Sequence, residues 1–152
     1  MQYLLMIYRS EAEASKMDAA AGQNRWTPMS PVTLRPWQRT AFDNFRQSDS
    51  PDFLAVATPG AGKTTFALTC ARATLAQWAA EGADGRRRLV VVAPTSHLKI
   101  QWSLAAHRLG LQLDPDWAPG QGIARDVHGL VTTYQQVATG PASNALRGIA
   151  AD

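Results

Sequence analysis

The residues best suited to chemistry form one run near the middle of the chain, from Thr58 to Thr65. Gly60 and Gly62 can adopt backbone torsions that are closed to residues with a Cβ, so successive amides can turn inward around an oxyanion. Next to them, Lys63 offers a compact cation, and the hydroxyl of Thr64 can complete the ligand shell of Mg²⁺. The run predicts a phosphate-binding loop made of Thr58, Pro59, Gly60, Ala61, Gly62, Lys63, Thr64 and Thr65.

The segments on either side of this loop give it the context that phosphate binding requires. An apolar run from Phe53 to Ala57 lies between two prolines and predicts a short buried strand. A helix is predicted from Lys63 to Glu81, with Gly82 placed to end it. A glycine-rich loop that only turns the chain is the alternative. The order strand, loop, helix favours phosphate binding over that alternative, because the free amides at a helix start attract negative charge.

The rest of the sequence alternates helical and extended patterns. The predicted elements are helices over Arg35–Gln47 and from Thr95 or Ser96 to Gly110, strands over Leu89–Ala93 and Val127–Thr132, a loop over Asp114–Gly122, and short helical pieces near Gln135 and over Ser143–Ala151. Strands that alternate with helices pair in parallel through right-handed crossovers. The sequence therefore predicts an α/β fold, with a parallel sheet and flanking helices.

Four segments, in this order, resemble motifs of superfamily 2 helicases and translocases of the DEAD/DEAH-box type. Leu34–Gln38 is similar to their adenine-reading motif, and Ala57–Thr64 to their motif I, in which an initial Ala is ordinary. Val92–Trp102 is similar to motif Ia, and Leu130–Gln135 to the Thr-Tyr-Gln segment that often precedes motif II. The resemblance covers about residues 32–137 and implies a partial RecA-like P-loop NTPase domain, the first of the two in such enzymes.

The resemblance also implies ligands and site residues. ATP and Mg²⁺ are the implied cofactors, with Gln38 reading an adenine edge and Thr64 coordinating the metal. Thr95 and Thr133 are implied to contact the backbone of a nucleic acid, with DNA favoured over RNA. The residues alone leave plainer interpretations open: an exposed helix residue for Gln38, a helix cap for Thr95 and a strand end for Thr133.

Three further features are predicted to be structural. Trp102 falls on the apolar face of its helix and is assigned to the core. Cys70 lies in the middle of a helix and is assigned there as a small apolar residue. Arg86 to Arg88 is expected to be a solvated turn before a strand rather than a nucleic-acid patch.

An ATPase of this kind also needs motif II, whose Asp holds Mg²⁺ and whose Glu positions the attacking water. The only acidic residue after Tyr134 is Asp152. Residues 31–152 are therefore expected to be an incomplete N-terminal RecA-like ATP-binding domain without catalytic residues, as in a gene fragment or an interrupted reading frame. Its implied intramolecular partner is the second, C-terminal RecA-like half. We expect uncovered strand edges and apolar faces, and a marginal or aggregation-prone product.

The N-terminal part and the composition add predictions about organisation and location. Residues 1–30 are expected to be a leader or linker, and residues 1–13 resemble the first strand of YCII-related proteins. The longest apolar run, Tyr3 to Tyr8, is far shorter than the roughly 20 residues of a membrane-spanning helix. A single cysteine fits a reducing compartment, so the cytoplasm is predicted and no membrane partner. The net charge of +3 permits a polyanionic partner without requiring one.

Two other functions compete with a helicase fragment. One is a stand-alone nucleotide-binding module that uses the loop without catalysis. The other is a small-molecule kinase, which at this size should carry an Arg-rich lid after its third strand, where only Arg147 occurs.

The missing acidic motif leads to a first prediction. We expect the isolated chain to bind ATP weakly if at all and to show no meaningful hydrolysis, because motif II, whose Glu would position the attacking water, is absent after Tyr134. A coupled phosphate-release assay measures this directly. Nucleic-acid-stimulated ATP hydrolysis by the pure chain would contradict it.

Overall fold

The structure is a computed structural model of the whole chain that describes residues 32–50, 52–82 and 88–140. In chain order its elements are α1 (Pro36–Gln47), α2 (Lys63–Ala80), β1 (Leu89–Ala93), α3 (Ser96–Arg108), β2 (Leu113–Asp114), β3 (Gly129–Thr133) and α4 (Tyr134–Ala138). The predicted α/β class is confirmed, as are the long helices and two of the strands to within two residues. The predictions for residues 1–30 and Ser143–Ala151 lie outside the described residues.

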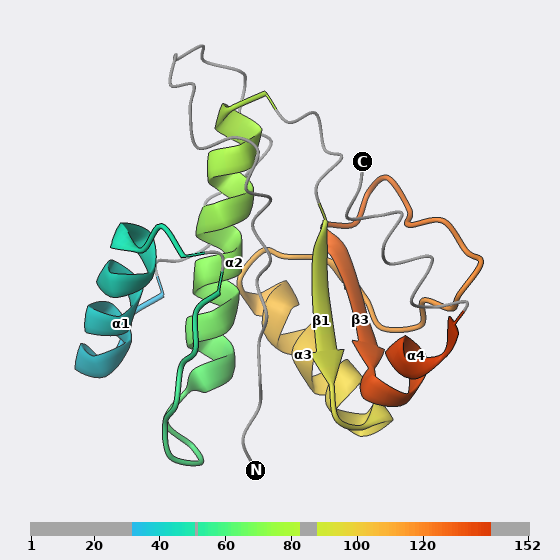
Figure 1. Cartoon of the computed structure of the whole chain (residues 1–152), viewed down its shortest axis with the longest axis horizontal. Helices are drawn as coiled ribbons and strands as arrows, with labels where there is room; N and C mark the ends of the chain where they lie inside the picture. Colours follow the sequence, from blue (N-terminus) through green and yellow to red (C-terminus); the bar gives the residue numbers. More distant parts are fainter. Residues whose placement is uncertain (1–31, 51, 83–87, 141–152) are drawn as a thin grey trace.

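The sheet is parallel and has three strands in the order β1-β3-β2 (Figure 1). The central strand, β3, is buried at every position, as expected for a strand covered on both faces. β1 pairs with β3 from Leu89 opposite Gly129 to Ala93 opposite Thr133, so the two strands end together. Only glycine fits at position 129, because a Cβ there would overlap the backbone of Leu89.

Helix α2 is buried on two sides and joins two apolar clusters. One face packs with β1, β3 and α3 through Ala67, Leu68, Ala71 and Leu75. The other face packs under α1 through Phe66 and Cys70. The core assignments of Cys70, 1% exposed, and Trp102, 8% exposed, are confirmed. No helix within the described ranges is both long enough and apolar enough to cross a membrane.

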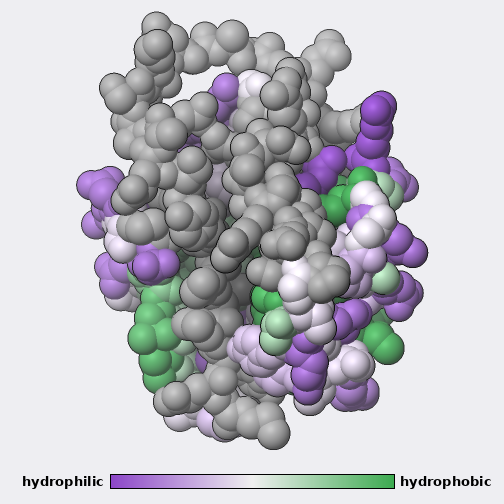
Figure 2. Space-filling model, turned by 45° about the vertical axis from the view of Figure 1, so that its right-hand side comes forward, coloured by the Kyte–Doolittle hydropathy of each residue, from purple (hydrophilic) through white to green (hydrophobic). Residues whose placement is uncertain are grey.

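The predicted buried strand from Phe53 to Ala57 is wrong. The segment is extended but pairs with no strand among the described residues, and Leu54 and Val56 are each 69% exposed. Phe53 and Ala55 point the other way, into the cluster beneath α1. An extended chain turns alternate side chains to opposite sides, so without a neighbouring strand one set faces solvent. Figure 2 shows hydrophobic side chains gathered at the surface on this flank of the molecule.

The third strand of the sheet is instead β2, which lies at the start of the region predicted as a loop. It consists of Leu113 and Asp114, which pair with Gly129 and Leu130 of β3. The loop that follows is anchored by Trp117, which is 1% exposed and donates its indole N–H to the carbonyl of Gln121 at 3.0 Å. Arg88 is half-buried before β1, and the other two arginines of the predicted turn lie outside the described residues.

His128 links the strands at the amino end of the sheet. Its backbone N–H donates to the carbonyl of Gln112 at 2.8 Å, and its carbonyl accepts from the N–H of Leu89 at 2.9 Å. The Nδ1 atom of its ring accepts from the N–H of Gln112 at 2.8 Å. Burial lowers the pKa of the imidazole below its usual value, and the nearby charge of Arg88 lowers it a little further.

This lowered pKa predicts a pH-dependent stability. We expect the free energy of unfolding to be unaffected by His128 above about pH 6.5 and to fall as the pH drops towards its folded-state pKa, because the unfolded chain then binds a proton that the folded chain excludes. His128→Asn retains an acceptor near Nδ1 but cannot titrate, so it should flatten this part of the profile. Urea denaturation across a pH series checks it. A variant with the unaltered slope would show that other groups govern the acid side.

Candidate nucleotide-binding loop and the adjoining sheet edge

The glycine loop adopts the backbone conformation that its sequence predicts. Gly60 has φ +75° and Gly62 has φ +89°, both in the left-handed region that glycine tolerates best. The turn is closed by the N–H of Ala61, which donates to the carbonyl of Thr58 at 3.2 Å. The loop begins after the extended segment and ends at α2, at the same end of the molecule as the carboxyl ends of β1 and β3 (Figure 1).

The first turn of α1 clamps this loop through its carbonyl oxygens. Arg35 donates a guanidinium N–H to the carbonyl of Gly60 at 3.2 Å, and Trp37 donates its indole N–H to that of Ala61 at 3.1 Å. Gln38 donates from Nε2 to the carbonyl of Gly62 at 2.8 Å. Three consecutive carbonyls are therefore held towards α1.

Gln38 is the buried centre of this clamp. It is 3% exposed, so its interpretation as an exposed helix residue is wrong. Its Oε1 accepts from the N–H of Arg35 at 2.7 Å, which forms a capping box at the start of α1. A Cβ at Gly62 would lie 2.7 Å from Nε2 of Gln38, so this glycine is required by space as well as by its φ. Each polar atom of the carboxamide has one further bonding position.

At the start of α2, backbone amides point away from any acceptor. Gly62 is the N-cap and no side chain caps the helix. The first helical amides, those of Lys63, Thr64 and Thr65, have no acceptor within the described part of the chain. The ammonium of Lys63 folds back on its own loop, donating to the carbonyls of Ala57 at 2.6 Å and Thr58 at 2.9 Å.

This arrangement can hold an anion. The loop carbonyls are turned towards α1, and the amides at the start of α2 have no acceptor among the described residues. Together with the positive end of the α2 dipole, these features favour negative charge at the loop. The Lys63 ammonium lies on the loop itself and can exchange its two carbonyl partners for phosphate oxygens. Thr64, half-buried on the first turn, offers its hydroxyl at the position predicted for a metal ligand. The residues present therefore fit a nucleotide phosphate chain with its Mg²⁺.

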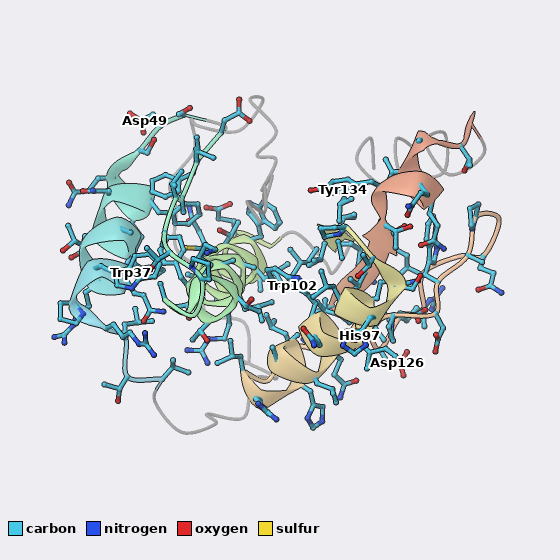
Figure 3. All side chains as sticks on the ribbon, turned by 90° about the horizontal axis from the view of Figure 1, so that it is seen from below. Trp37, Asp49, His97, Trp102, Asp126 and Tyr134 are labelled. Atoms are coloured by element: carbon cyan, nitrogen blue, oxygen red, sulfur yellow. The ribbon has the colours of Figure 1, made fainter. Side chains whose placement is uncertain are left out.

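The two threonines predicted to contact nucleic acid lie at the same edge of the sheet but differ in accessibility. Thr95 is exposed at the start of α3, and its hydroxyl makes no capping bond. Thr133 is 3% exposed, and its hydroxyl accepts from the N–H of Gln136 at 3.2 Å within a capping box. Thr133 ends β3, as its interpretation as a strand-end residue predicts, and it also caps α4. Figure 3 views this edge from below, with His97 and Tyr134 in the first turns of α3 and α4.

The sequence reasoning missed the roles of Arg35 and Trp37 on the loop. Both stand in the segment that resembles the adenine-reading motif, so their position beside Gln38 was the available signal. It also missed Lys99, which is 9% exposed and bonded to Gln136 near Thr133. Among residues 32–50, 52–82 and 88–140, no group of three or more His, Cys, Asp or Glu side chains could hold a metal ion.

The fold and the loop together define the class of this protein: an α/β domain in which a glycine loop, clamped by a preceding helix, opens a long helix. The family profile of the type III restriction enzyme res subunit matches residues 31–141, and the chain belongs to this family. The family is related to superfamily 2 helicases, in agreement with the resemblance of the motifs.

The chain is also similar to larger mycobacterial proteins. It is 41% identical over 129 residues to an uncharacterized protein of Mycobacterium tuberculosis strain H37Rv, covering 80% of this chain and 20% of the relative. It is 44% identical over 115 residues to an uncharacterized protein of Mycobacterium leprae, covering 75% of this chain and 18% of the relative. The chain thus spans about a fifth of the length of these relatives. No solved structure matches it.

The clamp predicts a graded response to alanine at the glycines. Gly60→Ala should cost about 1–2 kcal/mol of stability, because only its positive φ is strained and the space beside it is open. Gly62→Ala should cost more, because the new Cβ also displaces Gln38. Gly122→Ala, in open space and with no positive φ, is the matched control and should stay within about 0.5 kcal/mol of the parent. Chemical denaturation measures all three; equal losses at positions 60 and 62 would show that Gln38 does not restrict the loop.

Proposed function

We propose that this chain is the ATP-binding part of an ATP-dependent nucleic-acid helicase or translocase, and that it is catalytically inactive by itself. The observation that carries the proposal is that the amides of Lys63, Thr64 and Thr65 have no acceptor within the described residues. The preceding carbonyls of the loop are held towards α1. Such a cradle suits the phosphate chain of a nucleotide. Membership of a helicase-related family and the order of the four motifs support the ATP-driven, nucleic-acid-directed part.

In the proposed complex each residue of the loop has a task set by its chemistry. The amides of Gly62, Lys63, Thr64 and Thr65 donate to phosphate oxygens, and Lys63 turns its ammonium from the loop carbonyls to the outer phosphates. The Thr64 hydroxyl supplies one ligand to Mg²⁺, which when bound neutralises phosphate charge. Gln38 uses the remaining donor and acceptor positions of its carboxamide towards adenine, while its present bonds keep α1 on the loop.

Nucleic acid is proposed to lie along the carboxyl edge of β1 and β3. The exposed hydroxyl of Thr95 is free to donate to a phosphate oxygen, a contact that positions the backbone without reading bases. Thr133 contributes by holding the first turn of α4 through its capping box. The chain has a single cysteine, Cys70, and can form no internal disulfide, which supports the proposed cytoplasmic setting.

A loop substitution tests the nucleotide site. Lys63→Ala should weaken binding of a fluorescent ATP analogue by at least about tenfold, which corresponds to about 1.4 kcal/mol, because it removes the ammonium that the carbonyls of Ala57 and Thr58 hold on the loop. Thr64→Val should lower the gain in affinity that Mg²⁺ confers while leaving metal-free binding nearly unchanged. Arg46→Ala, at the far end of α1, is the control and should match the parent. Equal affinity of Lys63→Ala and the parent would overturn the proposed nucleotide site.

A further inference from the structure

Lys99 is a buried cation whose charge the described residues do not neutralise. It is one of three lysines in the chain, lies in α3 and is 9% exposed. Its Nζ donates to one acceptor in the described part of the chain, Oε1 of Gln136 at 3.3 Å. An ammonium has three N–H donors, and a neutral amide oxygen compensates a buried charge poorly. Two donors and a full positive charge are therefore left for an anion.

The acceptor on Gln136 is itself crowded. Besides Lys99, its Oε1 accepts from the hydroxyl of Thr132 at 3.2 Å and from the N–H and hydroxyl of Thr133 at 3.1 and 3.3 Å. An amide oxygen has two lone pairs, so four donors compete for it. Lys99 can give up this long bond to an incoming anion while Gln136 keeps its other partners.

Lys99 lies in the first turn of α3, near the carboxyl edge of the sheet. Ala93 is opposite Thr133 in the register, so β1 and β3 end together and α3 and α4 start there. Gln136, which accepts from the Lys99 ammonium, is only half-buried and its neighbour Tyr134 is exposed, so this contact lies among residues that reach the surface. Figure 3 looks directly onto this edge.

We propose that Lys99 binds a phosphate of the nucleic-acid backbone at this edge. The inference rests on the proposed function and deepens it, since it assigns the charged contact that the buried hydroxyl of Thr133 does not offer. A phosphate suits this position because its several oxygens can accept from more than one donor of the ammonium, and Thr95, the exposed N-cap of the same helix, stands four residues before Lys99. Neutralising a buried ammonium also makes the contact stronger than one at an exposed lysine.

Salt dependence separates a phosphate contact from a merely structural role. Anisotropy of a fluorescein-labelled single-stranded oligonucleotide, as DNA and as RNA, is measured with the 152-residue chain between about 50 and 200 mM salt. Lys99→Met should weaken binding to all sequences alike and reduce the slope of log K against log salt by about 0.7. Lys99→Arg should restore the slope. Both variants should bind the ATP analogue as the parent does.

A second measurement does not depend on any variant remaining folded. With only Lys16, Lys63 and Lys99 present, ¹⁵N-lysine labelling gives three side-chain ammonium resonances. The Lys99 resonance should shift when oligonucleotide is added, and the Lys63 resonance should shift when ATP and Mg²⁺ are added.

The outcomes distinguish this inference from the function on which it rests. Oligonucleotide binding with an unchanged slope in Lys99→Met, or with a stationary Lys99 resonance, would overturn the inference alone; the first result would indicate a structural role or pairing with a carboxylate. A parent chain that binds ATP but no oligonucleotide would overturn both the inference and the nucleic-acid part of the proposed function.

Discussion

The candidate site depends on keeping the carbonyl oxygens of the glycine loop away from the face that its amides present. A carbonyl oxygen repels an anion and an amide N–H attracts one, so a loop of this composition is suited to phosphate only when its amides face the ligand. Here side chains at the start of α1 hold the carbonyls of Gly60, Ala61 and Gly62. Each such bond contributes about 0.5–1.5 kcal/mol net. The donors come from Arg35, Trp37 and Gln38 at the start of α1, so the orientation of α1 fixes the loop.

Helix α2 transmits this constraint to the rest of the domain. The aromatic ring of Trp37, which bonds the loop, also packs against Phe66 with ring centroids 5.6 Å apart. One turn further along, the opposite face of α2 enters the core of the sheet through Leu68 and Ala71. A helix that is apolar around most of its circumference is buried on more than one side, and α2 meets that condition. The backbone amides at the start of α2 are thus positioned by the packing of this helix in both apolar clusters.

The sequence predicted the helices and the loop but not the pairing of every extended segment. The helical spacing of apolar residues and the terminal glycines placed α1, α2 and α3, because those signals are local. Phe53 to Ala57 was misjudged because an apolar run gives no information about whether a strand is available beside it. β2 was missed because two residues carry no periodicity, and their pairing is set by their register with β3. The clamp from Arg35 and Trp37 was also missed, because its hydrogen bonds join residues that are 25 and 24 positions apart in the sequence.

The distribution of carboxylates separates binding from catalysis in this chain. Hydrolysis would require a carboxylate beside Thr64, where metal and water would lie. Among the described residues, Glu81 ends α2, and 18 helical residues place the two ends of that helix about 27 Å apart. Asp52 begins the extended segment at its far end from the loop, and Asp126 precedes β3 at the amino end of the sheet. We therefore expect turnover at the proposed nucleotide site to require a carboxylate that another segment brings beside Thr64.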